Sequence, residues 1–274
     1  MRLKSRKAKL SDNAQLLLTP EDKEFFENKY PDLKKYIVRA EVSKYWSEYE
    51  RMYAFDFRGA SLKDLYKIPE LAERLDKIVE YRSKSSYRSP DTVIPHLYKG
   101  YTYIKDGFAW AIIQDVSTSK HFVIRESSNA LVIFGVAFCE STDRVLFGLL
   151  SSRLMWYWLG LIKGLQLGGT CASLASLTFN TFPPPKECSQ EALKAIVDAS
   201  ENLIAVRGKY SPTQWMDTYK EGKECFDVLN ALDKLDEVVY KAYNFIHDDG
   251  SLYDEEEALA GLLELYQDWE AEEE

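Results

Sequence analysis

The stretch "TFNTFPPP", residues 178–185, separates two parts of the chain that differ in pattern and in charge. A proline has no backbone N–H and its ring clashes with the preceding helical turn, so three in a row cannot continue a helix or a central strand. Before this stretch the sequence is β-rich and then apolar, whereas after it apolar residues recur at helical spacing. The prolines therefore predict a domain boundary, with one domain over residues 1–186 and a second over residues 187–274.

The first domain is expected to combine helices with short strands. A helix is predicted over residues 20–36, where a proline and acids precede lysines, and another over residues 61–85, with a break at Pro69. Alternating aromatic and apolar residues over 51–57 predict a strand. Residues 92–140 are rich in β-branched and aromatic side chains and predict four or five short strands joined by turns.

The apolar segment "VLFGLLSSRLMWYWLGLI", residues 145–162, is almost long enough to span a bilayer. Two serines and Arg153 lie at its centre, where an arginine costs roughly 2.5–3.5 kcal/mol even on the insertion scale. We therefore predict a buried helix over residues 143–163 and no membrane partner. Arg153 is expected either in an ion pair, which is the preferred interpretation, or on an exposed polar stripe with the serines.

Beyond the prolines, three segments carry apolar residues at i, i+3, i+4 and i+7, the spacing of amphipathic helices. These segments are residues 189–207, 225–245 and 254–269. The predicted fold class is therefore α+β: a small β-rich domain with flanking helices, followed by a small C-terminal helical bundle.

Charge is distributed unevenly along the chain. Residues 201–274 hold 6 Lys/Arg and 20 Asp/Glu, a net charge of −14, whereas the first 200 residues hold 29 basic and 24 acidic residues, a net charge of +5. Only the first part is therefore expected to face a polyanion such as a nucleic acid. The alternative is an acidic, solubilising C-terminal segment on a domain of nearly neutral charge.

Within the first part, residues 81–125 carry seven basic and three acidic residues, with five tyrosines interleaved. Basic and aromatic side chains on loops beside strands suit contacts to phosphates, base edges and unstacked bases. The alternative is an ordinary tyrosine-rich sheet surface with scattered lysines.

Several enzyme classes lack their signatures in this sequence. There is no GxxxxGK[ST] loop, and "LGGT" at 167–170 lacks the third glycine of a dinucleotide fingerprint. The three histidines fall in separate segments without a nucleophile motif, and the four cysteines form no CxxC pair. We therefore expect no catalytic, cofactor-binding or metal-binding residue, and a reducing, cytoplasmic setting.

Six stretches, in this order, resemble one family: residues 16–55, 61–82, 148–158, 179–185, 232–245 and 252–266. They include "GLLSSRLMWYW" and the aromatic-Asn-Thr-Phe-Pro signature within "FNTFPPP". Over roughly residues 14–268 the chain resembles the C-terminal part of MmeI-like, or class I, adenine-specific (N6) DNA methyltransferases of restriction–modification systems. That part holds the target recognition domain and a helical C-terminal region.

The resemblance implies a specificity module that binds double-stranded DNA and works with a methyltransferase catalytic subunit or domain. The [ND]PPY motif and the S-adenosylmethionine loop are absent from this sequence. The chain is thus expected to be non-catalytic alone, with S-adenosylmethionine held by the partner, which flips the target adenine. The DNA-binding candidates are Lys84, Arg88, Lys99, Lys120, Arg125, Arg153, Lys163 and Asn180.

One departure favours another class of function. Relatives carry arginine and tyrosine in the loop before the signature, whereas here no charge occurs between Lys163 and Lys186. Because phosphate contacts supply much of DNA affinity, this neutral loop and the acidic C-terminal part favour an acidic protein–protein adaptor or an inhibitor of a restriction–modification or phage-defence complex. A gene remnant without activity is a third reading.

Overall fold

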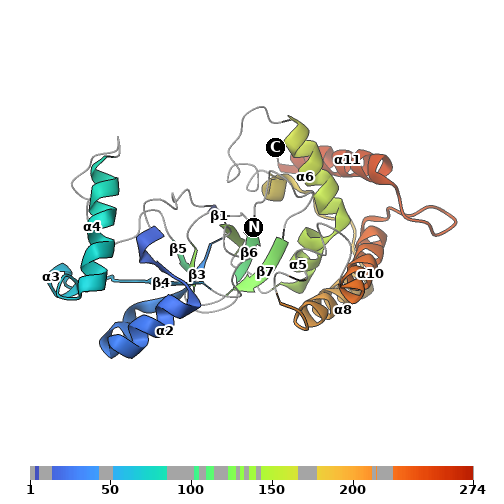
Figure 1. Ribbon diagram of the computed structural model, residues 1–274. Helices are drawn as coiled ribbons and strands as arrows, with labels where there is room; N and C mark the ends of the chain where they lie inside the picture. Colours follow the sequence, from blue (N-terminus) through green and yellow to red (C-terminus); the bar gives the residue numbers. More distant parts are fainter. Residues whose placement is uncertain are drawn as a thin grey trace. The chain divides into compact units, whose positions relative to one another are not determined.

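The computed structural model is an α+β protein that divides into two compact units (Figure 1). Unit 1 comprises Met1–Ser5, Ala109–Glu126 and Ala137–Glu274, and unit 2 comprises Arg6–Phe108 and Ser127–Val136. The predicted α+β fold class is confirmed. The structure describes residues 4–5, 14–42, 52–84, 102–104, 109–113, 123–127, 130–132, 136–139, 143–165, 178–211, 214 and 225–273.

Unit 2 is built on a five-stranded mixed sheet with the strand order β2-β4-β3-β8-β5. Its strands are β2 (Leu17–Leu18), β3 (Ile37–Glu41), β4 (Met52–Phe55), β5 (Thr102–Ile104) and β8 (Ala130–Val132). Neighbouring strands are antiparallel except β3 and β8, which run parallel and pair Ala40 with Leu131. A parallel pair requires a crossover connection rather than a hairpin, and the long chain segment between β3 and β8 supplies one.

Five helical segments belong to unit 2 within the described residues: η1 (Ala14–Leu16), α2 (Pro20–Lys29), η2 (Pro31–Tyr36), α3 (Leu62–Leu65) and α4 (Pro69–Ser83), where η marks a 3-10 helix. The single helix predicted over residues 20–36 is wrong, because α2 ends at Lys29. Pro31 disfavours helical backbone at the residue before it, and Tyr30 has φ −134° and ψ 74°. The predicted break at Pro69 is confirmed, since α4 begins there.

The core of unit 2 is aromatic. The ring centroids of Phe26 and Phe55 lie 5.0 Å apart, edge to face, and those of Phe55 and Phe57 lie 4.7 Å apart, stacked. Leu18 and Leu75 are fully buried in the same cluster. Because Phe26 comes from α2, Phe55 from β4 and Leu75 from α4, this cluster joins both longer helices to the sheet.

Unit 1 combines a four-stranded sheet with helices. The sheet has the order β1-β9-β6-β7, formed by β1 (Lys4–Ser5), β6 (Ala109–Ile113), β7 (Val123–Ser127) and β9 (Val136–Cys139), with β1 antiparallel to β9. The β-rich region predicted over residues 92–140 therefore contributes strands to two sheets, two to unit 2 and three to unit 1. Residues 92–98, predicted as a strand, lie outside the described residues.

The helices of unit 1 are α5 (Arg144–Ser151), α6 (Arg153–Leu165), α8 (Gln190–Arg207), α10 (Phe226–Tyr243) and α11 (Glu255–Glu273). The three helices predicted after the prolines are confirmed as α8, α10 and α11. The predicted domain boundary near residue 186 lies inside unit 1. Whether residues 1–186 and 187–274 fold as separate domains stays a prediction.

The single helix predicted over residues 143–163 is wrong, because the chain bends by 59° between α5 and α6. Ser152 has extended backbone, with ψ 162°, and its Oγ donates a hydrogen bond to the Leu149 carbonyl at 2.7 Å. Such a side-chain bond competes with the hydrogen bonds of the helix backbone, and the extended conformation at Ser152 ends α5. Among the described residues no single helix is long and apolar enough to cross a membrane, and only this bent pair meets that test by length and composition.

A close helix crossing holds α5 against α8 and α10. A Cβ atom placed on Gly148 would lie 2.6 Å from Cγ2 of Ile196 and from Oγ of Ser200, and 3.2 Å from Cδ1 of Leu235. Only a residue without a side chain permits this approach. The glycine therefore sets the distance between α5 and the two helices that follow the prolines.

Candidate functional site

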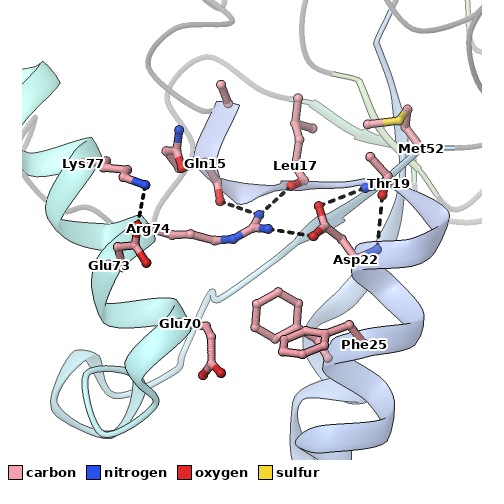
Figure 2. Close-up of a pocket in the computed structure, with 12 residues that line it drawn as sticks. Gln15, Leu17, Thr19, Asp22, Phe25, Met52, Glu70, Glu73, Arg74 and Lys77 are labelled. Carbon is pink, nitrogen blue, oxygen red and sulfur yellow. Dashed lines mark hydrogen bonds and ion pairs between the residues drawn. The ribbon is translucent and has the colours of Figure 1, made fainter.

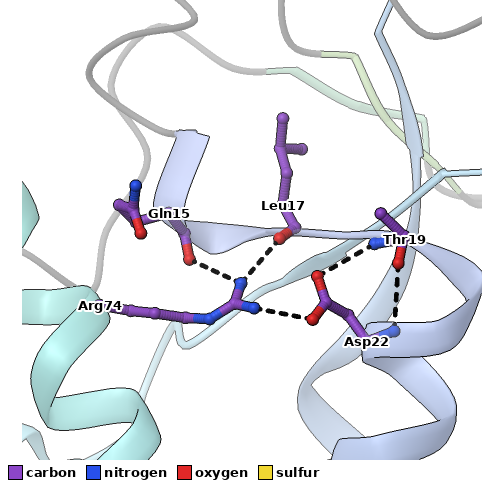
Figure 3. A network of polar contacts seen from close by, with 5 residues as sticks. All are labelled: Gln15, Leu17, Thr19, Asp22 and Arg74. Atoms are coloured by element: carbon purple, nitrogen blue, oxygen red, sulfur yellow. Dashed lines mark hydrogen bonds and ion pairs between the residues drawn. The ribbon is translucent and has the colours of Figure 1, made fainter.

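A polar network of unit 2 is centred on Arg74 of α4 (Figure 3). Its Nη1 donates hydrogen bonds to the carbonyl oxygens of Gln15 at 3.3 Å and Leu17 at 3.0 Å, and its Nη2 pairs with Oδ1 of Asp22 at 2.9 Å. The guanidinium also lies 5.3 Å from the ring centroid of Phe26. Arg74 thus joins α4 to three segments of unit 2: η1, β2 and α2.

The other oxygen of Asp22 takes part in the cap of α2. Oγ1 of Thr19 accepts a hydrogen bond from the Asp22 backbone N–H at 3.1 Å, and Oδ2 of Asp22 accepts one from the Thr19 N–H at 3.4 Å. This reciprocal pair is a capping box. The Asp22 carboxylate therefore both caps the start of α2 and pairs with the arginine of α4. Its charge serves to hold these elements of the fold together.

A pocket of about 530 Å³ lies between α2 and α4, and the residues of this network form part of its lining (Figure 2). Phe25, 44% exposed, and Met52 supply apolar lining, while Glu70, Glu73 and Lys77 supply charge. Glu73 pairs with Lys77 at 2.6 Å. Every charged residue that lines this pocket has an ion-pair partner, so the lining offers a ligand little unpaired charge.

Glu70, at the edge of the same pocket, is held by residues of α2 and its end. It accepts hydrogen bonds from Nζ of Lys29 and from the Tyr30 hydroxyl, the latter at 2.7 Å. The hydrogen bond from Lys29, followed by that from Tyr30, lowers the pKa of Glu70 to about 2. The carboxylate is therefore ionised at neutral pH and links α4 to the C-terminal end of α2.

A second polar cluster lies in unit 1, where α6 begins against α10. Oδ1 of Asp236 accepts a hydrogen bond from the Arg153 backbone N–H at 2.7 Å, and Oδ2 lies 3.3 Å from Nη2 of Arg153. Nη2 also lies 3.1 Å from Oδ1 of Asp233. The preferred interpretation of Arg153, an ion pair, is confirmed. Asp236 in addition caps α6 from another helix, because an aspartate oxygen on a first-turn N–H is the N-cap interaction.

Burial changes the protonation of this cluster. Asp236 is 3% exposed, and its burial raises its pKa to about 6 although Arg153 acts in the opposite direction. Burial lowers the pKa of Arg153, but Asp236 and the groups around it outweigh that effect and raise it, so the arginine stays charged. Burial, foremost, also raises the pKa values of Tyr157 and Tyr240 beside the cluster.

The signature stretch packs against α6 and α10. Residues 178–181 are helical, and Oγ1 of Thr181 accepts a hydrogen bond from Nε1 of Trp158 at 3.1 Å. The Phe182 ring lies 6.5 Å from that of Trp158 and 6.1 Å from that of Tyr243. The Tyr243 hydroxyl donates to the Pro183 carbonyl at 2.8 Å. The signature therefore holds the chain on the helical part of unit 1.

The structure places the predicted DNA-binding residues in different parts of the chain. Lys84 follows α4 and pairs with Glu80 at 2.6 Å, and Arg153 is held by α10. Asn180 lies half-buried in the helical turn of the signature. The backbone positions of Arg125 in β7 and Lys163 in α6 are described, but their side chains are not, and Arg88, Lys99 and Lys120 lie outside the described residues. Their role in DNA contact stays a prediction.

Sequence reasoning missed Arg74 and Asp236. The arginine occurs in a helix full of alternating charges, a pattern that gives no hint of a half-buried residue joining several segments. Asp236 does leave a signal, because it falls four residues after Leu232, on the apolar face of its helix. Where the structure describes side chains, no group of three or more metal-binding residues occurs.

These features define the class of the protein. It is an α+β module, and in the part that the structure describes its charged networks connect helices and strands of the same unit. The chain belongs to the family of the MmeI target recognition domain, whose model matches residues 5–186. The predicted family resemblance is confirmed.

A solved structure gives the same fold. The Type IIL restriction-modification enzyme MmeI, in a structure determined in complex with DNA, superposes on this chain with a TM-score of 0.78 at 23% sequence identity. The likeness covers 99% of this chain and 36% of that chain, so this chain spans about a third of the length of the matched enzyme. No curated protein matches this sequence.

Proposed function

We propose that this chain is the DNA target-recognition module of a restriction–modification enzyme. The observation that carries the proposal is the family match over residues 5–186, which makes two thirds of the chain a target recognition domain of the MmeI type. The fold shared with MmeI over nearly the whole chain supports it, because that structure is a complex with DNA.

In the proposed division of labour, this chain positions duplex DNA and a methyltransferase domain or subunit performs the chemistry. The partner would hold S-adenosylmethionine and flip the target adenine for N6 methylation, since chemistry on a base requires its removal from the stack. The matched enzyme is almost three times as long as this chain, which leaves room there for such a domain. The basic residues between 81 and 125 are the proposed DNA contacts.

An acidic protein–protein adaptor is the second candidate, and one observation favours it. The C-terminal helix α11 begins with Glu255, Glu256 and Glu257, all exposed, within the region that carries the net charge of −14. Such a surface repels DNA and suits a basic protein partner. The two candidates differ in salt dependence, because only DNA binding releases condensed counterions.

Fluorescence anisotropy of a labelled random-sequence duplex, titrated with the protein at several salt concentrations, tests the proposal. We expect binding whose affinity falls steeply as salt rises, and weaker binding by the double variant Arg88→Ala/Lys120→Ala. The control is Lys209→Ala/Lys241→Ala, which removes equal charge from lysines that pair with Asp227 and Glu237. Absence of binding even at low salt would reject independent DNA recognition and favour the adaptor.

A further inference from the structure

One corner of unit 2 holds a second cavity of about 530 Å³, lined by Lys35, Tyr36, Asp56, Arg58 and Gly59. Lys35 and Tyr36 end η2, and the other three form the turn after β4. We call these residues, with Lys34, the η2–β4 corner. It shares no lining residue with the pocket between α2 and α4.

The corner is held together by short-range contacts that fix its shape. The Asp56 backbone N–H donates to the Tyr36 carbonyl at 2.6 Å, and the rings of Tyr36 and Phe57 lie 5.4 Å apart. The turn closes with a hydrogen bond from the Ala60 N–H to the Phe57 carbonyl at 3.0 Å, with Gly59 at φ +79°. A positive φ at the third position of a turn is typical of type II geometry, which favours glycine there. The corner is therefore formed before any ligand arrives.

Lysine pairing sets this corner apart from most of unit 2. Five lysines of unit 2 whose side chains are described form ion pairs with acidic residues: Lys23, Lys29, Lys67, Lys77 and Lys84. Within the described part of the unit, Lys34, Lys35 and Lys63 have no such pair. Lys35 lines the cavity, Lys34 precedes it in η2, and Lys63 comes four residues after Gly59.

The acids of the corner do not cancel these charges. Asp56 is engaged by Arg58, whose Nε lies 2.8 Å and 3.0 Å from its two carboxylate oxygens. Asp32, exposed at the start of η2, is the other nearby acid. Nζ of Lys35 lies 5.0 Å from the centroid of the Tyr36 ring, a contact that orients the ammonium without neutralising it. A net positive charge therefore faces a preformed hollow.

We propose that Lys34 and Lys35 bind a backbone phosphate of duplex DNA at the η2–β4 corner, an inference that rests on the proposed function. An ammonium group is a point charge suited to phosphate, and contacts to phosphates position a protein on DNA without reading its sequence. The corner thus sets the orientation of unit 2 on the duplex, while residues elsewhere read the bases.

Two exposed lysines can be removed here without disturbing the core, so the double variant Lys34→Ala/Lys35→Ala is a direct test. Each phosphate contact contributes about −0.9 to the slope of log affinity against log salt concentration. We expect the slope to become shallower by about 1, and the affinity for a random-sequence duplex to fall roughly fivefold to tenfold at about 0.1 M salt. The double variant Lys34→Arg/Lys35→Arg keeps the charge and should retain both the salt slope and the affinity of the wild-type protein.

The matched control is Lys67→Ala/Lys77→Ala, which removes two exposed lysines of the same unit that are paired with Asp64 and Glu73. If the corner variant loses no more affinity or salt slope than this control, the phosphate site is refuted while the proposed function stands. If the wild-type protein shows no salt-dependent binding, both are refuted together. Circular dichroism spectra that coincide for all variants establish that the comparison concerns folded proteins.

Discussion

Replacing Asp236 with asparagine should change how the stability of unit 1 depends on pH. The side chain is 3% exposed, and burial raises its pKa from 3.8 to about 6. Asparagine keeps an oxygen that can accept the Arg153 N–H, now at 2.7 Å from Asp236, but it carries no charge and does not titrate. The variant therefore keeps the hydrogen bond that caps α6 and removes the buried charge.

The sign follows from proton linkage. A carboxyl group whose pKa is higher in the folded state than in the unfolded state stabilises the fold fully below pH 3.8, and this contribution is lost as pH rises through about 6. A shift of about two pKa units corresponds to about 3 kcal/mol. The wild-type protein should therefore lose up to about 3 kcal/mol between pH 4 and pH 7 through this group, and Asp236→Asn should not.

The assay is urea unfolding at pH values from 4 to 8, followed by tryptophan fluorescence, because Trp158 is buried on α6 five residues after Arg153. We expect the variant to match the wild type near pH 4 and to exceed its stability above pH 7, since Arg153 keeps Asp233 as a partner. A variant that is less stable than wild type by the same amount at every pH would show that the ion pair outweighs the burial of Asp236, and would refute the reasoning.

Two further substitutions test the packing and the clamp. Gly148→Ala should destabilise unit 1 by about 1–3 kcal/mol, because its Cβ would lie 2.6 Å from Ile196 and Ser200, whereas Gly160→Ala, with open space around it, should be neutral or slightly stabilising in thermal denaturation. Equal effects of the two would contradict the close crossing. Arg74→Met should destabilise unit 2 by about 1–3 kcal/mol by leaving the carbonyl of buried Leu17 without its donor, and hydrogen exchange should accelerate in residues 14–18, while Lys77→Ala should leave it unchanged. Unaltered exchange in the Arg74 variant would show that the clamp does not hold η1 and β2.

Local signals in the sequence were sufficient for much of the fold. Helical periodicity located α8, α10 and α11, and proline chemistry located the start of α4. The order of short motifs gave the family that the match over residues 5–186 confirms. The sequence also favoured the ion pair of Arg153, because an arginine in an apolar segment requires a partner when buried.

Two helix predictions failed at points where a local choice competes with periodicity. Residues 20–36 have helical composition, but Pro31 restricts Tyr30 and divides them into two segments. Residues 143–163 are largely apolar, yet extended backbone at Ser152 ends one helix, and Asp236 caps the next from a distance of 83 residues in sequence. Periodicity reports which face is apolar and does not report where a distant side chain caps a backbone N–H.

By itself, the sequence determined the fold class, the helices beyond the prolines and the family, because each depends on residues that are neighbours in the chain. Tertiary structure alone decided that the strands between residues 102 and 139 divide between two sheets, that Arg74 joins α4 to β2, and that Asp236 starts α6. It also showed which lysines are neutralised by acids and which, at the η2–β4 corner, are not. The physical reason is that hydrogen bonds, ion pairs and burial act between atoms that are close in space, whatever their separation along the chain.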